Sequence, residues 1–271
     1  MKAFHNFTSK DWSNYIGPYL YLKLKNRYGT NKAIAAAFER DTDFSTCKAV
    51  TGLKVSDHMT GKMEGIKCIT SACTVNDHCK KLHKSGGICE HCYAFKYLNM
   101  RPTVRKCYER NSNVLSNAMD VSFMPSFRKG DFVRLESFGD LINREHIENY
   151  LLIAFKNPKT NFALFTKRRF MLENYFKHFK VKKPKNLAIV SSAYTLNDDQ
   201  NTELYASYET NDQLGFKLVD TVFNVYTNDE NIQKKDRLAL HTHECEKQCR
   251  FCLVCWHNTM DDIMLVKERL K

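Results

Sequence analysis

Residues 131–166, DFVRLESFGDLINREHIENYLLIAFKNPKTNFALFT, contain two short apolar runs with a longer segment between them. The runs Asp131–Glu136 and Asn161–Phe165 are rich in β-branched and aromatic residues, as strands are. Between them, Ile142–Phe155 repeats its apolar residues at intervals of three and four, which is typical of a helix. Strand, helix and strand in this order predict a βαβ unit with parallel strands.

The same alternation continues on both sides of this unit. Further helices are predicted over Asn31–Arg40, Pro102–Met119 and Arg168–Phe179, and further strands over Asn186–Ser191 and Asp220–Tyr226. We expect an α/β fold, a partial TIM-like (βα) barrel with parallel strands plus cysteine-rich metal-binding segments. Residues 1–60 are expected to form a partly helical N-terminal extension, 61–257 the core, and 258–271 a C-terminal tail. The polar segment Asn197–Asp212 is predicted to lie on the surface.

Composition limits the classes of protein to which the chain can belong. Of its 271 residues, 43% are hydrophobic and 27% are charged, which is typical of a globular protein. Mean hydropathy is -0.50, and the chain has no run of 18 apolar residues, so no membrane span is expected. The first ten residues lack the apolar stretch of a secretory signal, and a cytoplasmic location is therefore expected.

Cysteine is the unusual residue type, with 11 in the chain. An odd number of cysteines in a cytosolic chain of this length indicates reduced thiols rather than a disulfide framework. We interpret Cys47 and Cys107, which stand apart, as small apolar residues. The other nine fall in two blocks and are predicted metal ligands: Cys68, Cys73, Cys79, Cys89 and Cys92, then Cys245, Cys249, Cys252 and Cys255.

The C-terminal block has the spacing C-x3-C-x2-C-x2-C. Thiolates are soft ligands that suit zinc and iron–sulfur clusters. Structural zinc sites usually separate two close pairs of ligands by a longer loop, so four closely spaced cysteines favour an iron–sulfur cluster. His241, His243 and His257 flank the block, which keeps a cysteine–histidine zinc site as the alternative.

Polar residues follow two of the predicted strands directly. Glu136, Ser137 and Asp140 follow the first strand, and Lys167 follows the second. Ligand sites in parallel α/β folds lie at the carboxyl ends of the strands, so we predict that these four residues bind a cofactor. For Asp140 the alternative is a capping role at the next helix.

Two segments resemble the radical S-adenosylmethionine (radical SAM) family. Cys245–Cys252 has that family's C-x3-C-x2-C form, and Cys89-Glu-His-Cys92-Tyr93-Ala94 resembles the end of its motif. Ser85 stands where the first cysteine of the upstream motif would be, so Cys68, Cys73 and Cys79 would supply the missing ligands. The resemblance implies a 4Fe–4S cluster that transfers an electron to S-adenosylmethionine, with Glu136 and Asp140 at the cofactor's polar end.

The chain is also similar to the phage gene product eighty-eight family, which has no assigned reaction. The features that carry this resemblance lie between residues 65 and 257: Cys92-Tyr93-Ala94, Arg134-Leu-Glu136-Ser-Phe-Gly139-Asp140-Leu, Phe162-Ala-Leu-Phe-Thr166-Lys167 and the terminal cysteines. Residues 1–60 are expected to lie outside it. The resemblance implies a metal-bearing core and gives no substrate.

The formal net charge of +12 raises the question of a nucleic-acid partner. Between residues 166 and 185, aromatic residues interleave eight basic ones: Lys167, Arg168, Arg169, Lys177, Lys180, Lys182, Lys183 and Lys185. Basic residues with aromatics can bind phosphates and stack on bases. The structural alternative is a solvated basic face over aromatic residues that belong to the core.

Three functions are consistent with the sequence. The first is an enzyme that starts radical chemistry from S-adenosylmethionine with one or two iron–sulfur clusters, acting on an unknown substrate. The second is an iron–sulfur protein for electron transfer or redox sensing without radical chemistry. Both imply an electron donor as partner. The third is a zinc-stabilised protein that binds nucleic acid.

Overall fold

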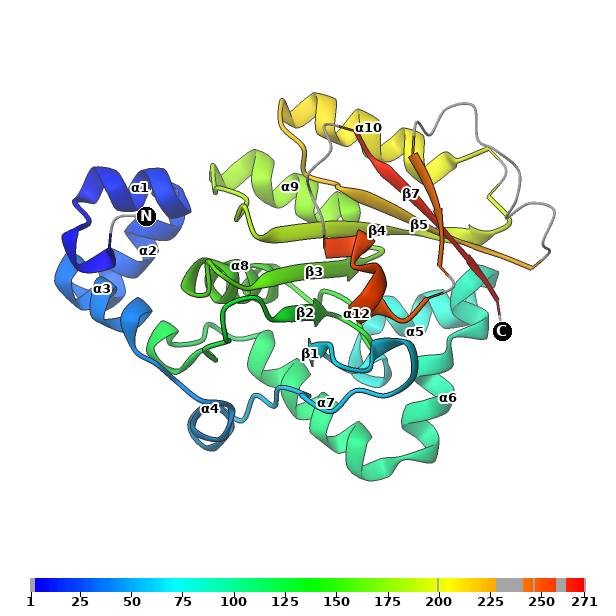
Figure 1. The fold of residues 1–271 in the computed structure, drawn as a ribbon, viewed down its shortest axis with the longest axis horizontal. Helices are drawn as coiled ribbons and strands as arrows, with labels where there is room; N and C mark the ends of the chain where they lie inside the picture. The colour runs from blue at the N-terminus through cyan, green and yellow to red at the C-terminus, as the bar shows by residue number, and fades with distance from the viewer. Residues whose placement is uncertain (1–2, 199, 228–240, 246, 257–261, 271) are drawn as a thin grey trace.

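The structure, a computed structural model, is built on a seven-stranded sheet in which all neighbouring strands are parallel (Figure 1). It describes residues 3–198, 200–227, 241–245, 247–256 and 262–270. The strand order is β1-β2-β3-β4-β5-β7-β6, and these strands form an open sheet. Their bounds are β1 Lys67–Ile69, β2 Phe132–Leu135, β3 Asn161–Thr166, β4 Leu187–Leu196, β5 Thr221–Tyr226, β6 His241–Glu244 and β7 Met264–Arg269. The predicted α/β class with parallel strands is confirmed.

The strands predicted from residues 131–166 pair directly. β2 and β3 are parallel neighbours, with Val133 opposite Phe162. Three strands, β1, β6 and β7, were not predicted. β1 is only three residues long, and β7 lies in the segment expected to be a tail, where it inserts between β5 and β6. Residues 264–269 are therefore part of the sheet.

The helices predicted over residues 31–40, 102–119, 142–155 and 168–179 are each present, whereas the other helices were not predicted individually. Helix α10 overlaps the segment that was predicted as a polar surface stretch: Tyr205 is 50% exposed, while Leu204 packs with Val222 and Leu265. The helices are α1 Ser9–Ile16, α2 Pro18–Tyr28, α3 Asn31–Glu39, α4 Phe44–Thr51, α5 Asp77–Lys84, α6 Tyr93–Met100, α7 Pro102–Leu115, α8 Arg144–Lys156, α9 Arg169–Phe179, α10 Thr202–Leu214 and α12 Cys249–Cys252. None of the helices in the described ranges is long and apolar enough to cross a membrane.

The two faces of the sheet are covered by different parts of the chain. Phe162 and Leu164 of β3 join the main core, which includes residues of α8 and α9. The alternate residues Ala163 and Phe165 pack instead with Trp256 of the 3-10 turn η6 (Val254–Trp256). Figure 1 shows α12 crossing in front of β3 and β4. We call the face that contacts Trp256 the inner face, because the C-terminal segment covers it.

The N-terminal helices pack against the core on the side of the sheet that α8 and α9 cover. Trp12 of α1 is fully buried and belongs to the same core as β2 and β3. The hydroxyl of Tyr15 donates a 2.7 Å hydrogen bond to the carbonyl oxygen of Phe155 at the end of α8. Helices α1 to α4 lie within residues 1–60, and residues of all four belong to the core that β2 and β3 share.

Candidate metal centres

The loops that follow β1 and β2 interlock at the carboxyl edge of the sheet. The hydroxyl oxygen of Thr70 accepts hydrogen bonds from the backbone N–H groups of Ser137 (3.0 Å) and Phe138 (2.9 Å). In the other direction, the backbone N–H of Cys73 donates to the carbonyl oxygen of Phe138 (2.8 Å). The start of the cysteine-rich segment is thereby fixed to the loop after β2.

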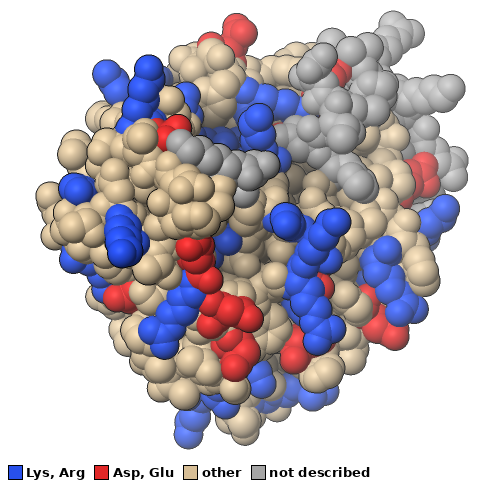
Figure 2. Space-filling view, turned by 60° about the vertical axis from the view of Figure 1, so that its left-hand side comes forward, with Lys and Arg blue, Asp and Glu red and all other residues tan. Residues whose placement is uncertain are grey.

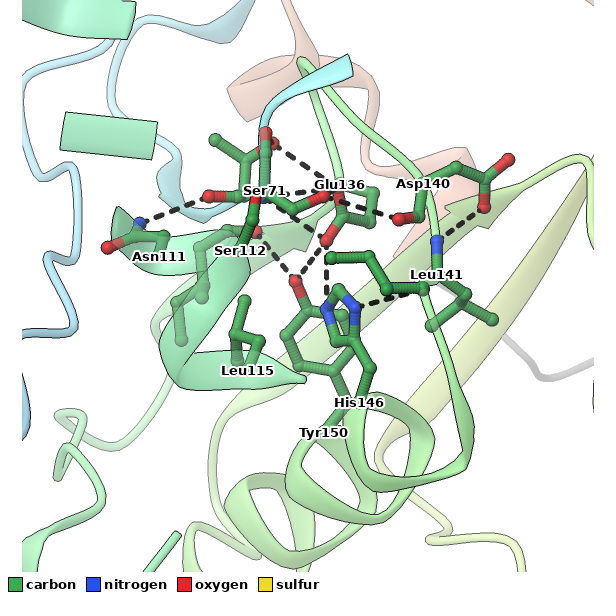
Figure 3. A network of polar contacts seen from close by, with 12 residues as sticks. Ser71, Asn111, Ser112, Leu115, Glu136, Asp140, Leu141, His146 and Tyr150 are labelled. Atoms are coloured by element: carbon green, nitrogen blue, oxygen red, sulfur yellow. Dashed lines mark hydrogen bonds and ion pairs between the residues drawn. The ribbon is translucent and has the colours of Figure 1, made fainter. Parts of the chain in front are cut away.

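Glu136 is the centre of a buried polar network (Figure 3). It is 2% exposed, and its carboxylate accepts hydrogen bonds from the hydroxyls of Tyr150 and Ser71 (2.8 Å from Ser71). His146 Nε2 lies 3.1 Å from the same carboxylate. Because His146 Nδ1 accepts the backbone N–H of Ile142, we assign the ring proton to Nε2, facing Glu136.

The network keeps the buried carboxyl of Glu136 ionised. Burial acts to raise its pKa, but the contacts from His146, Tyr150 and Ser71 outweigh burial and lower the pKa below the ordinary value. Glu136 also has a φ of 62°, in the left-handed region that residues other than glycine seldom adopt. A strained backbone and a fully partnered carboxylate together indicate that Glu136 supports the surrounding loops.

Asp140 joins the loop after β2 to the end of β3. Its carboxylate accepts hydrogen bonds from the hydroxyl of Thr166 (2.5 Å) and the backbone N–H of Lys167 (2.9 Å). Burial raises the pKa of Asp140, and the charge of Glu136 acts in the same direction. The alternative prediction that Asp140 caps the next helix is wrong, because Asn143 caps α8. The hydroxyl of Ser137 also has a partner, the thiol of Cys68 at 3.2 Å.

Four cysteines gather after β1, and we call them the first thiol group: Cys73, Cys79, Cys89 and Cys92. The hydrogen bond between Cys73 and Cys92 lowers the pKa of Cys92 and raises that of Cys73. Cys92 also caps α6, whose first backbone N–H groups favour its thiolate. Burial raises the pKa of Cys79, and the negative charges of Cys89 and Cys92 add to this effect.

Lys167 lies beside the first thiol group. Its ammonium donates a hydrogen bond to the carbonyl oxygen of Ala193. Burial lowers the pKa of Lys167, and among the neighbouring charges that oppose this shift Cys89 is the strongest, with Asp140 next. Of the four predicted cofactor-binding residues, Lys167 is thus the positively charged one, while the charges of Asp140 and Glu136 act on Cys79 with the opposite sign.

The C-terminal cysteines form a second set, which we call the second thiol group: Cys245, Cys249, Cys252 and Cys255. It lies in the connection between β6 and β7. Burial raises the pKa of Cys255, and the other three cysteines raise it further. Burial likewise raises the pKa of Cys245 to about 11.

Two basic side chains from outside the second thiol group contact it. His243 Nε2 lies 3.1 Å from Cys252 Sγ, and Lys62 Nζ lies 3.6 Å from Cys245 Sγ. His257, which also flanks the block in sequence, lies outside the described residues. Of the three histidines predicted as alternative zinc ligands, His243 is therefore the one that the described contacts place beside the thiols.

Cys68 differs from the other predicted ligands. It is fully buried within β1, and its thiol donates to the hydroxyl of Ser137. Burial raises its pKa to about 12. Among the described residues, no group of three or more His, Cys, Asp or Glu side chains is arranged to hold a metal ion. The cysteine thiols that are neighbours fall into the two groups defined above.

The basic stretch between residues 166 and 185 is partly internal. Arg169 is 4% exposed and forms an ion pair with Glu203 (2.9 Å), and Lys183 pairs with Asp220 (2.5 Å). Tyr175 and Phe176 belong to the main core. On the face seen in Figure 2, basic and acidic side chains are interspersed. These contacts support the structural interpretation of the stretch.

Several residues of the site could not be assigned from the sequence. Arg134 of β2 acts to lower the pKa of Cys249, and the charges of Cys92 and Cys68 act to raise the pKa of Tyr93 in α6. Both residues therefore lie near cysteines. His146 and Tyr150 supply the network around Glu136. The one available signal was a charged residue, Arg134, inside an otherwise apolar strand.

The family model described as gene product 88 matches residues 24–258. The match begins within α2 and ends just after η6, so the expectation that residues 1–60 lie outside the family is wrong from residue 24 onward. No curated protein and no solved structure matches the chain.

Proposed function

The chain belongs to the gene product 88 family, and we propose that it is an iron–sulfur protein with two cysteine-ligated centres and a redox function. The first thiol group would hold one centre and the second thiol group the other. The observation that carries the proposal is the gathering of four thiols at the carboxyl edge of a parallel sheet, where ligand sites of such folds lie.

The donor set of the first thiol group fits an iron–sulfur cluster. Four cysteines match the usual ligand number, and thiolate is the ligand type that such clusters require. Cys92 has a lowered pKa at the start of α6, so one thiolate forms readily. The ammonium of Lys167 adds a positive charge beside Cys89, which favours further thiolates.

The donor set of the second thiol group also fits a cluster. Its four cysteines lie within eleven residues, and three of them bear on the pKa of the fourth, Cys255. Thiols with raised pKa values are protonated at neutral pH when no metal is bound. Metal binding would displace these protons, because the thiolate is the metal ligand. When bound, such clusters supply one-electron oxidation and reduction.

Metal and sulfide analysis tests the proposal directly. Protein purified without oxygen is expected to be brown, with iron matched by acid-labile sulfide and about eight irons per chain for two four-iron clusters. A colourless protein that holds zinc would overturn the proposal. In that case His243 beside Cys252 becomes a candidate ligand, and salt-dependent binding to a nucleic acid is the next measurement.

A second candidate function is radical chemistry that starts from S-adenosylmethionine. The order of elements favours it, because the first thiol group directly follows β1 and because β1 to β5 are parallel and adjacent in chain order, as in a partial (βα) barrel. S-adenosylmethionine would bind an iron that has no cysteine ligand. One cysteine of the first thiol group would therefore have to remain unbound to iron. Formation of 5′-deoxyadenosine after incubation with dithionite and S-adenosylmethionine would support this function. A cluster whose spectrum does not change on adding S-adenosylmethionine would leave electron transfer or redox sensing.

A further inference from the structure

Arg134 is a charged residue in the middle of an apolar strand. Its neighbours in β2, Val133 and Leu135, are fully buried in the main core. Because side chains alternate along a strand, Arg134 projects to the opposite, inner face. Its guanidinium lies over the ring of Phe165, 3.7 Å from the ring centroid, which also lies on that face.

The half-buried guanidinium of Arg134 has only neutral partners among the contacts of the described residues. It donates to the carbonyl oxygen of Glu136 (3.4 Å) and contacts Met63 Sδ (3.8 Å). No carboxylate in the described part of the chain lies within ion-pairing distance of it. A desolvated cation without a negative partner is destabilising, so this position calls for an anion.

The second thiol group lies at the same place on the inner face. Cys249 and Cys255 pack against the cluster formed by Phe165 and Trp256. The indole N–H of Trp256 donates a 3.0 Å hydrogen bond to the carbonyl oxygen of Val133, the residue before Arg134. Arg134 contacts Phe165 of this cluster and Met63, which packs against it as the two cysteines do. Arg134 and two cysteines of the second thiol group therefore meet at the same cluster on the inner face.

We propose that Arg134 is the counter-ion of an iron–sulfur centre in the second thiol group, and that its charge raises the reduction potential of that centre. The inference rests on the proposed function, since it needs the cluster. A four-iron cluster with four thiolates is an anion, and one-electron reduction makes it more negative. A cation beside it stabilises the reduced form more than the oxidised form. Arg134 is thus a positioning and tuning residue.

Two other cations near the second thiol group, Lys62 and Arg250, have carboxylate partners. Lys62 forms an ion pair with Glu268. Arg250, within α12, forms one with Glu64 (3.7 Å) and is exposed. Arg250 therefore provides a control, because its removal lowers the net charge by the same amount at a position that is paired and exposed.

The test compares Arg134→Gln, Arg134→Lys and Arg250→Gln with the wild-type chain. Dithionite and redox mediators supply electrons, and electron paramagnetic resonance follows the signal that Cys252→Ala abolishes. For Arg134→Gln we expect a tenfold loss in the equilibrium constant for reduction, or about 59 mV lower potential for one electron. Arg134→Lys, which keeps the charge, and Arg250→Gln are expected to remain near the wild-type potential.

The outcomes separate this inference from the proposed function. A wild-type chain without clusters overturns both. A wild-type chain with clusters and an unchanged potential in Arg134→Gln overturns only the role of Arg134. If Arg134→Gln does not fold, Arg134→Lys tests the inference instead. A reduction potential of Arg134→Lys far from the wild-type value, despite the retained charge, would contradict an electrostatic role of Arg134.

Discussion

The backbone N–H of Cys73 donates a 2.8 Å hydrogen bond to the carbonyl oxygen of Phe138. This bond joins the first cysteine of the first thiol group to the loop after β2. The polar residues around Phe138 therefore act on the cysteines through the backbone. Changes in this loop should affect metal binding even where they remove no ligand.

Gly139→Ala is expected to destabilise the protein and to empty the first thiol group of metal. A Cβ atom at position 139 would lie 2.1 Å from Ser71 Oγ and 2.8 Å from Glu136 Oε2. The loops after β1 and β2 would have to separate, at a cost of about 1–3 kcal/mol, as for other overpacked sites. Denaturant unfolding and iron analysis measure the two effects.

Gly130→Ala is the control for this substitution. A Cβ atom there meets nothing within 4 Å, although its φ of 84° makes alanine unfavourable by about 1–2 kcal/mol. It should therefore lower stability and leave the iron content unchanged. A Gly139→Ala protein with full iron content would contradict the proposed link between the loop and the cysteines.

Glu136→Gln is expected to lower the free energy of unfolding at pH 7 by about 1.5–3 kcal/mol, the range for hydrogen bonds to a charged group. The pKa of Glu136 is lower in the folded protein than the ordinary value of 4.5. Its ionisation therefore stabilises the fold above pH 4.5, and this contribution is lost as the pH falls through the lowered pKa. Urea unfolding of both proteins between pH 3 and 7 measures the difference. Glu209→Gln, on the exposed side of α10, should change stability by less than about 0.5 kcal/mol.

Lys156 gives a prediction for alkaline pH, whereas the prediction for Glu136 concerns acidic pH. Its buried ammonium donates hydrogen bonds to the carbonyl oxygens of Val121 and Met124, and burial lowers its pKa to about 8 from 10.5. Between these values the unfolded chain binds more protons, so this group makes stability rise with pH. Above pH 8, the free energy of unfolding of the wild type should rise relative to that of Lys156→Met by up to about 1.4 kcal/mol per pH unit. Lys159→Met, at an exposed position, should follow the wild-type pH dependence; a Lys156→Met curve parallel to wild type would refute the shift.

The sequence predicts most of the sheet because its central strands are buried on both faces. β3 has an unbroken apolar run, β2 and β5 are apolar apart from Arg134 and Asn224 in their interiors, and α8 between β2 and β3 has a clear period. β7 escapes prediction because its residues, MLVKER, become a strand only through pairing with β5 and β6, far away in sequence. Such pairing is a property of the tertiary structure.

The site was predicted by position more reliably than by role. Glu136 and Asp140 do lie at the carboxyl edge of the sheet, as the strand order implied. The sequence could not reveal that their carboxylates face Tyr150 and Thr166 from within the fold, because those partners lie 14 and 26 residues away. A polar residue that follows a strand can support a loop as well as bind a ligand.

Variants of single cysteines would test whether the two thiol groups are separate centres. Cys79→Ala and Cys252→Ala should each remove about half of the iron, because each lies in one group only. Cys252→Ala should also lower the melting temperature, since metal binding is coupled to folding and the second thiol group covers the inner face of the sheet. Cys68→Ala should keep all the iron, because the Cys68 thiol is hydrogen-bonded to the hydroxyl of Ser137. Cys107→Ala, on α7, is the control for a cysteine outside both groups. Complete loss of iron from either Cys79→Ala or Cys252→Ala would instead mean that the two groups share one centre.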